Sequence, residues 1–190
     1  MTSGLITTLA IFVFVLITTL LGVRQVPQGF KWVVQRLGKF DCSLNPGLNF
    51  IIPYVDTVAY KVTTKDIVLD IPSQEVITKD NAVLITNAVA YINIMSPEKA
   101  VYGVEDYVIA IQTLVQTSLR SIIGEMTLDD ALSSREHIKM KLKASISDDI
   151  SDWGITLKTV EIQDVNPSPT MQAAMAEQAA AERARRATVT

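Results

Sequence analysis

The side chains best suited to catalysis are few in this sequence and lie far apart. The 190 residues contain a single His, His137, and a single Cys, Cys42. A transition-metal site needs several such ligands at short spacings, and a single Cys cannot form an internal disulfide. We therefore expect no metal centre and no cofactor.

Nucleophilic catalysis and nucleotide binding also lack a recognisable pattern. A catalytic His needs an oriented partner, whereas His137 is expected among charged neighbours on the polar side of an amphipathic helix. The eight Gly fall in neither GxxxxGK[ST] nor GxGxxG spacing. Asp129 and Asp130 follow Thr127 at an expected helix start, where negative charge is favourable. We predict no catalytic residues, and a serine-type hydrolase is the weaker alternative because Ser and Lys are abundant.

The distribution of charge argues against a nucleic-acid partner and favours a membrane. The formal net charge is -3, and nucleic-acid binding needs a concentrated basic face, so no nucleic-acid partner is expected. From Thr2 to Val23 the chain has no Lys, Arg, Asp, Glu or His. As a helix, that run would span about 33 Å, close to the hydrocarbon thickness of a bilayer.

Residues 1–25 are therefore predicted to be a transmembrane anchor. A cleaved signal peptide is the first alternative, but it would need a basic start and small residues before a cut site. A buried core helix is the second, but it would show a polar stripe at period 3.6. Neither pattern is present.

Basic and aromatic residues follow this run. Residues 24–40 include basic residues and no acid, so the positive-inside rule places the bulk of a single-pass chain on the cytoplasmic side of the cell (inner) membrane. Basic side chains attract anionic headgroups, and aromatic rings favour the interface. The predicted membrane-interface residues are Arg24, Phe30, Lys31, Trp32, Arg36 and Lys39. Lys31 and Arg36 have an alternative as ordinary outward residues of a strand.

Residues 26–168 predict an α+β domain, because extended segments are followed by helices and then by one strand over residues 155–165. Residues 83–94 form a long run with two apolar faces, one of which holds Val83, Ile85, Val89 and Tyr91. We expect a sheet covered on both sides or one that meets a neighbouring subunit. The apolar residues 48–54 are predicted to pack in the core rather than dip into the bilayer beside the anchor.

Several helix boundaries can also be predicted. Ser96 and Pro97 are typical of a helix start, and Ile111, Leu114 and Leu119 belong to an apolar stripe over residues 107–123. A capping box over residues 133–136 should open a helix that ends near Gly154. Its apolar positions recur every four residues. They are Ile138, Leu142, Ile146 and Ile150.

Residues 169–190 predict an Ala-rich helix that begins after Ser168, as the start of a coiled coil. We expect the sequence to be a piece of a longer chain, because the helix is short for a coiled coil. The predicted oligomerisation residues combine this helix with one face of the long strand. They are Val83, Ile85, Val89, Tyr91, Met171, Ala174, Met175, Gln178, Glu182 and Arg186.

Five segments between Val26 and Ala187 carry a resemblance to a known family. They are RLGKF, NPGLNFIIPYVD, DIPSQEVITKDNA, TSLRSIIGEMTLDDALSSRE and DWGITLKTVEIQDVNPSPTMQAAMAEQAAAERARRA. Together they resemble the stomatin and prohibitin proteins, which carry an SPFH or band 7 domain. The resemblance is closest to bacterial stomatin-like membrane proteins of the QmcA kind.

The resemblance implies a function without catalytic residues. The resemblance implies that copies of the chain form rings or cages. Such assemblies would organise membrane microdomains and regulate membrane proteins such as membrane-bound AAA proteases. The expected partners are the lipid bilayer, further copies of the chain and such membrane proteins. The alternative is a dedicated regulatory subunit of one membrane protease.

Overall fold

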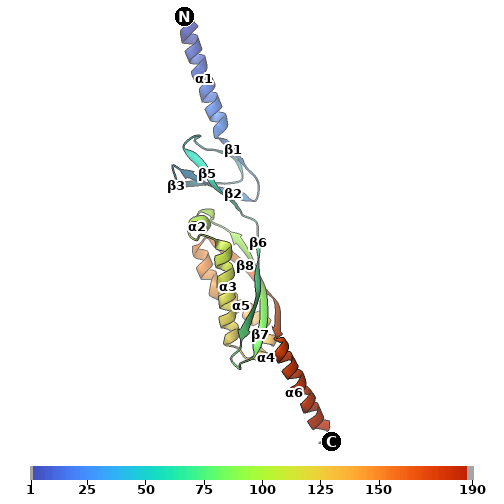
Figure 1. Cartoon of the computed structure of the whole chain (residues 1–190). Helices are drawn as coiled ribbons and strands as arrows, with labels where there is room; N and C mark the ends of the chain where they lie inside the picture. The colour runs from blue at the N-terminus through green and yellow to red at the C-terminus, as the bar shows by residue number, and fades with distance from the viewer. Residues whose placement is uncertain (1, 188–190) are drawn as a thin grey trace. The chain divides into compact units, whose positions relative to one another are not determined.

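The computed structural model describes residues 2–187, with side chains described for residues 9–177 and for a few positions beyond. Contacts divide the chain into two compact units, which are described separately (Figure 1). The first unit holds the residues up to Asp66, together with Asn93–Glu105 and Trp153–Ile155. The second holds Ile67–Ile92, Asp106–Asp152 and the residues from Thr156 onward.

The first unit combines an N-terminal helix with two small antiparallel sheets. Its elements are α1 (Thr2–Gly22), β1 (Val23–Val26), β2 (Phe30–Arg36), β3 (Lys39–Leu44), β4 (Gly47–Phe50), β5 (Asp56–Thr63) and α2 (Pro97–Tyr102). Strands β1 and β4 pair with each other, and the other sheet has the order β3-β2-β5. A small core of Val26, Val34, Leu44 and Ile51 lies between the strands.

Helix α1 confirms that the charge-free run is helical, over 21 residues. Its large apolar side chains are exposed from Leu9 to Leu21. Among the residues that the structure describes, no helix is long and apolar enough to cross a membrane. The predicted transmembrane span therefore stays a prediction.

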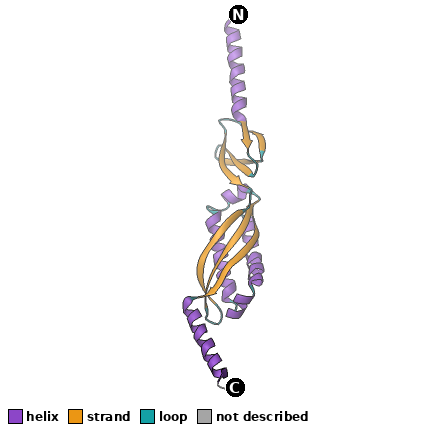
Figure 2. Ribbon diagram, turned by 90° about the vertical axis from the view of Figure 1, so that its right-hand side faces the viewer, coloured by secondary structure: helices purple, strands orange, loops and turns teal. Residues whose placement is uncertain are grey.

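The second unit is a sheet with helices on one of its faces (Figure 2). Its elements are β6 (Ile67–Ile77), β7 (Val83–Ile94), β8 (Ile155–Pro167), α3 (Tyr107–Gly124), α4 (Leu128–Ser133), α5 (Arg135–Asp152) and α6 (Pro169–Ala187). The strand order is β6-β7-β8. Strands β6 and β7 are antiparallel. Strand β8 also runs antiparallel to β7, because Ser168 contacts Val83 while Asp164 contacts Asn87.

The core of the second unit follows from two periodicities. In β7 every second residue faces the helices, and Leu84, Ala88 and Ile92 are fully buried. In α5 every fourth residue is fully buried, as the sequence predicts. These are Ile138, Leu142, Ile146 and Ile150. Ile111 and Leu119 of α3 complete the layer, whereas Leu114 is only half-buried.

The other face of this sheet is open, so the prediction of a sheet covered on both sides is wrong for the described residues. The physical reason lies in the neighbouring strand. Asp70 is the register partner of Val89, and Glu75 is the register partner of Ile85. These carboxylates give β7 polar neighbours on that face, which suits an antiparallel sheet with one solvated side. The alternative, a face that meets a neighbouring subunit, remains.

Helix ends partly confirm the predicted boundaries. The Thr127 hydroxyl accepts a hydrogen bond from the Asp130 amide at the start of α4. The predicted capping box is wrong, since Ser133 is the last residue of α4 and its hydroxyl donates to the Asp129 carbonyl. Asp106, which the sequence analysis missed, caps α3 through two backbone amides.

Helix α5 ends two residues before Gly154, as predicted. Only glycine fits at position 154. Its φ is +67°, and an added Cβ would lie 2.6 Å from Cβ of Ser96. The Gly154 carbonyl accepts hydrogen bonds from the amides of Met95 and Ser96. A side chain at this position would therefore break the contact that joins the end of β7 to the residues after α5.

Candidate membrane-facing surface

Large apolar side chains project into solvent around the end of β4 in the first unit. Leu37 is 85% exposed, Leu48 is 78% exposed and Tyr54 is 77% exposed. Phe50 and Ile52 are exposed as well. We call these five residues the apolar rim. Several exposed large apolar side chains in one small unit are typical of a surface that contacts a membrane or a protein.

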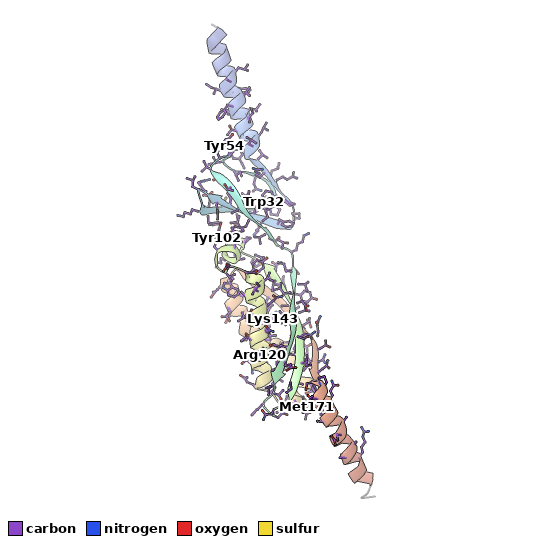
Figure 3. All side chains as sticks on the ribbon, in the orientation of Figure 1. Trp32, Tyr54, Tyr102, Arg120, Lys143 and Met171 are labelled. Carbon is purple, nitrogen blue, oxygen red and sulfur yellow. The ribbon has the colours of Figure 1, made fainter. Side chains whose placement is uncertain are left out.

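The apolar rim begins where α1 ends. The Ile51 amide donates a hydrogen bond of 2.9 Å to the Gly22 carbonyl, and Val23 is the register partner of Phe50. Only glycine allows this approach, because a Cβ on Gly22 would lie 2.6 Å from the Ile51 carbonyl oxygen. Tyr54 is labelled beside the end of α1 in Figure 3.

Two rim residues are held in a backbone conformation that large side chains rarely adopt. The φ of Leu37 is +50° and that of Tyr54 is +73°. Leu37 and Gly38 form the two-residue turn between β2 and β3, with positive φ at both positions, as in a type I′ hairpin. The Leu37 amide donates to the Val55 carbonyl. The hairpin accounts for the positive φ of Leu37, and both side chains are held in exposed positions.

The predicted core packing of residues 48–54 is therefore mostly wrong. Ile51 alone among its large apolar residues is buried, at 4% exposure. The β1-β4 pair is too small to cover both sides of this segment, so alternate side chains point outward. The alternative of contact with the bilayer remains.

The predicted interface residues lie in the same unit but differ in exposure. Arg24 in β1 and Lys39 in β3 are exposed, and Lys31 in β2 is half-buried. Phe30 and Trp32 are half-buried against the small core. The Lys61 ammonium lies 4.6 Å from the centre of the Trp32 ring. Their assignment to the membrane interface stays a prediction.

Arg36 is held in an ion pair, and its assignment to the membrane interface stays a prediction. Its Nε lies 2.7 Å from Oδ1 of Asp56, and its Nη2 lies 3.1 Å from Oδ2. Asp56 also accepts a hydrogen bond of 2.8 Å from the Ile52 amide. The Arg36 hydrogen bonds, followed by the Ile52 amide, hold the pKa of the Asp56 carboxyl below its usual value. This ion pair ties the rim segment to β2 and β5.

The predicted oligomerisation residues lie in the second unit, in two groups. Val83, Ile85, Val89 and Tyr91 alternate along the open face of β7, as predicted, but Val89 is buried and only Tyr91 is exposed. Their role in oligomerisation stays a prediction. Met171, labelled in Figure 3, is half-buried near the start of α6, and Ala174 and Met175 are exposed. The predicted oligomerisation residues Gln178, Glu182 and Arg186 have side chains outside the described set.

Candidate catalytic groups are not brought together in the part of the chain that the structure describes. His137 is exposed on α5. Burial first, and then Asp41, raises the pKa of the Cys42 thiol, which disfavours a reactive thiolate. Within the described residues, no three His, Cys, Asp or Glu side chains are placed to hold a metal ion.

Two small sheets beside an N-terminal helix, followed by a sheet with helices on one face, fit the family that the sequence resembles. Residues 24–190 match the SPFH domain / Band 7 family. The chain belongs to this family, as predicted.

Individual relatives agree with this assignment. The chain is similar to an uncharacterized protein of Methanocaldococcus jannaschii, with 42% identity over 179 residues, 94% of this chain and 88% of the relative. A stomatin homolog of Pyrococcus abyssi is 42% identical over 189 residues, 100% of this chain and 70% of the relative. Human stomatin-like protein 2, mitochondrial, is 41% identical over 164 residues, 86% of this chain.

The chain spans 46% of the length of that human relative. The narrower likeness to QmcA-type proteins stays a prediction. Membership of the family is consistent with a membrane scaffold.

Proposed function

We propose that the protein is a non-enzymatic scaffold, anchored in a membrane by α1, whose copies assemble side by side. The observation that carries the proposal is the apolar rim at the end of α1. Five large apolar side chains are exposed there, and two of them have positive φ. Contact with a bilayer would remove this surface from water, with a gain of roughly 25 cal/mol for each Å² buried.

The proposed anchor is supported by the sequence of the charge-free run from Thr2 to Val23. As a helix, this run would extend about 33 Å at the usual rise, close to the thickness of a hydrocarbon core. The hydroxyls of Thr18 and Thr19 donate to carbonyls one turn back, so these polar groups are compatible with lipid. By the positive-inside rule, the remainder of the chain lies in the cytoplasm.

Lateral assembly is supported by the unpartnered surfaces of the second unit. The open face of β7 exposes Tyr91 and half-buries Val83 and Ile85, and the described side chains near the start of α6 are mostly exposed. Copies confined to one plane meet at high effective concentration, so weak contacts suffice. Clients of such an assembly would be membrane proteins such as a membrane-bound AAA protease, which proximity labelling in cells would identify.

A lipid-contact experiment tests the rim directly. The full chain with Cys42→Ser and Ile52→Cys is labelled with a fluorophore and placed in bilayers that contain quenching lipids. We expect strong quenching at position 52, because the rim lies in the headgroup region. The control is Met140→Cys, at a position that is more exposed than Ile52 but lies on α5. Equal, weak quenching at both positions would refute membrane contact by the rim.

A further inference from the structure

A pocket of about 350 Å³ lies between β1, β2 and β5 in the first unit. Its volume lies at the lower end of the range for small-molecule sites. Two cationic side chains line it, Arg24 from β1 and Lys61 from β5. The Trp32 ring forms one wall and holds the Lys61 ammonium 4.6 Å from its centre.

The one carboxylate of this pocket does not neutralise these cations. Asp56 lines the pocket, but its oxygens accept hydrogen bonds from Arg36 and from the Ile52 amide. Among the ion pairs of the described residues, none involves Arg24 or Lys61. The pocket therefore offers two positive charges without a paired anion.

The position of Arg24 indicates where the ligand would come from. Arg24 follows the last residue of α1 by two positions, a distance of about 7 Å along an extended strand. If α1 is the anchor, Arg24 lies at the depth of the lipid headgroups. Ile51 and Val58 add apolar walls, which suit a glycerol backbone but not a free inorganic anion.

We propose that this cationic pocket binds the phosphate of an anionic phospholipid headgroup, with Arg24 and Lys61 on the phosphate and Trp32 against the glycerol. Arginine donates paired hydrogen bonds that match phosphate oxygens, and lysine adds a point charge. The positive charge of both residues opposes the ammonium of a zwitterionic headgroup. The proposal rests on the proposed membrane function, and it adds the lipid class and the residues that select it.

The fluorescence of Trp32 provides a test. The chain has two Trp, so Trp153→Phe leaves Trp32 as the only indole. The full chain in neutral detergent is titrated with dihexanoyl phosphatidylglycerol, dihexanoyl phosphatidylcholine or inorganic phosphate. We expect a saturable change in emission with phosphatidylglycerol. Binding of the other two ligands should be at least about tenfold weaker, because phosphatidylcholine carries a positive ammonium and inorganic phosphate lacks the glycerol.

Two double variants separate a built site from general charge attraction. Arg24→Gln with Lys61→Gln should weaken phosphatidylglycerol binding about tenfold or more, through loss of two charge-assisted contacts. Lys65→Gln with Lys99→Gln removes the same charge from exposed positions outside the pocket and should leave binding unchanged. Equal weakening in both variants, or equal binding of phosphatidylcholine, would overturn the proposal. Equal binding of inorganic phosphate would assign the pocket to a free anion instead.

A separate extraction experiment distinguishes failure of this proposal from failure of the anchor. Membranes that carry the unmodified chain are washed with alkaline carbonate. Retention of the chain together with absent phosphatidylglycerol binding would overturn the pocket and leave the proposed function intact. Release of the unmodified chain by carbonate would overturn the anchor itself.

Discussion

At the scale of single residues, Asp56 fixes the segment that carries the apolar rim. Its side chain is almost inaccessible to solvent, and it joins Arg36 to the backbone of Ile52. Arg36 also contacts Asp41, whose side chain is much more exposed. The two carboxylates therefore bind the same guanidinium from different surroundings, and they provide a matched pair for mutation.

Asp56→Asn should lower the thermal midpoint of the full chain at pH 7, because an amide cannot accept from Arg36 and Ile52 as a carboxylate does. Asp41→Asn should have a smaller effect, since exposed ion pairs contribute little. Circular dichroism during heating measures both midpoints. A larger loss for Asp41→Asn would contradict the role assigned to Asp56.

The ion pair of Asp56 with Arg36 also predicts that the stability of the chain depends on pH. The pKa of Asp56 is lower in the folded chain than its unfolded value of about 3.9. The stability that it contributes is therefore present above about pH 4 and is lost as the pH falls through the folded pKa. We expect the difference in midpoint between the unmodified chain and Asp56→Asn to shrink from pH 5 towards pH 2. A constant difference would show that the carboxylate charge is unimportant.

At the scale of elements, the packing of α3 and α5 on the sheet should dominate the stability of the second unit. Ile146→Ala in α5 removes a fully buried side chain and should reduce the free energy of unfolding by about 2–5 kcal/mol. Met140→Ala on the same helix removes an exposed side chain and should change it by less than about 0.5 kcal/mol. Urea unfolding followed by far-ultraviolet circular dichroism compares the two variants.

The sequence predicted the elements with one clear period better than the irregular ones. In α5 the four-residue repeat identifies the buried stripe without any knowledge of the tertiary structure. In β6 one strand continues through Pro72, with a bulge between Ile71 and Gln74. In β8 the buried positions Leu157, Val160 and Val165 depart from a two-residue period. A bulge depends on neighbouring strands, which a local pattern does not contain.

The apolar rim shows a different limit. Leu48, Phe50 and Ile52 are as apolar as core residues, so hydrophobicity alone favours burial. What exposes them is the small size of the β1-β4 pair, which becomes visible only when the strands are placed. The basic and aromatic residues that follow the anchor were found from composition, whereas Lys61 was missed because it enters the pocket from a later strand.

At the scale of the whole molecule, the proposed assembly predicts a mass. The unmodified chain extracted in mild detergent should give a light-scattering mass several times 20.9 kDa. Ile85→Glu with Tyr91→Glu should lower that mass, because added charge on the open face of β7 repels an identical face. The control is Ile109→Glu on the exposed side of α3. A monomer from the unmodified chain would refute lateral assembly.

The division of the chain into two units also has a genetic consequence. The polypeptide leaves the first unit after Asp66, re-enters it at Asn93, leaves again after Glu105, and returns briefly for Trp153–Ile155. Neither unit is therefore a continuous stretch of sequence. Consider a single recombination event between two related genes at a point within residues 67–155. In the resulting protein, each of the two units would contain residues from both parents. Such a product would keep neither parental core intact.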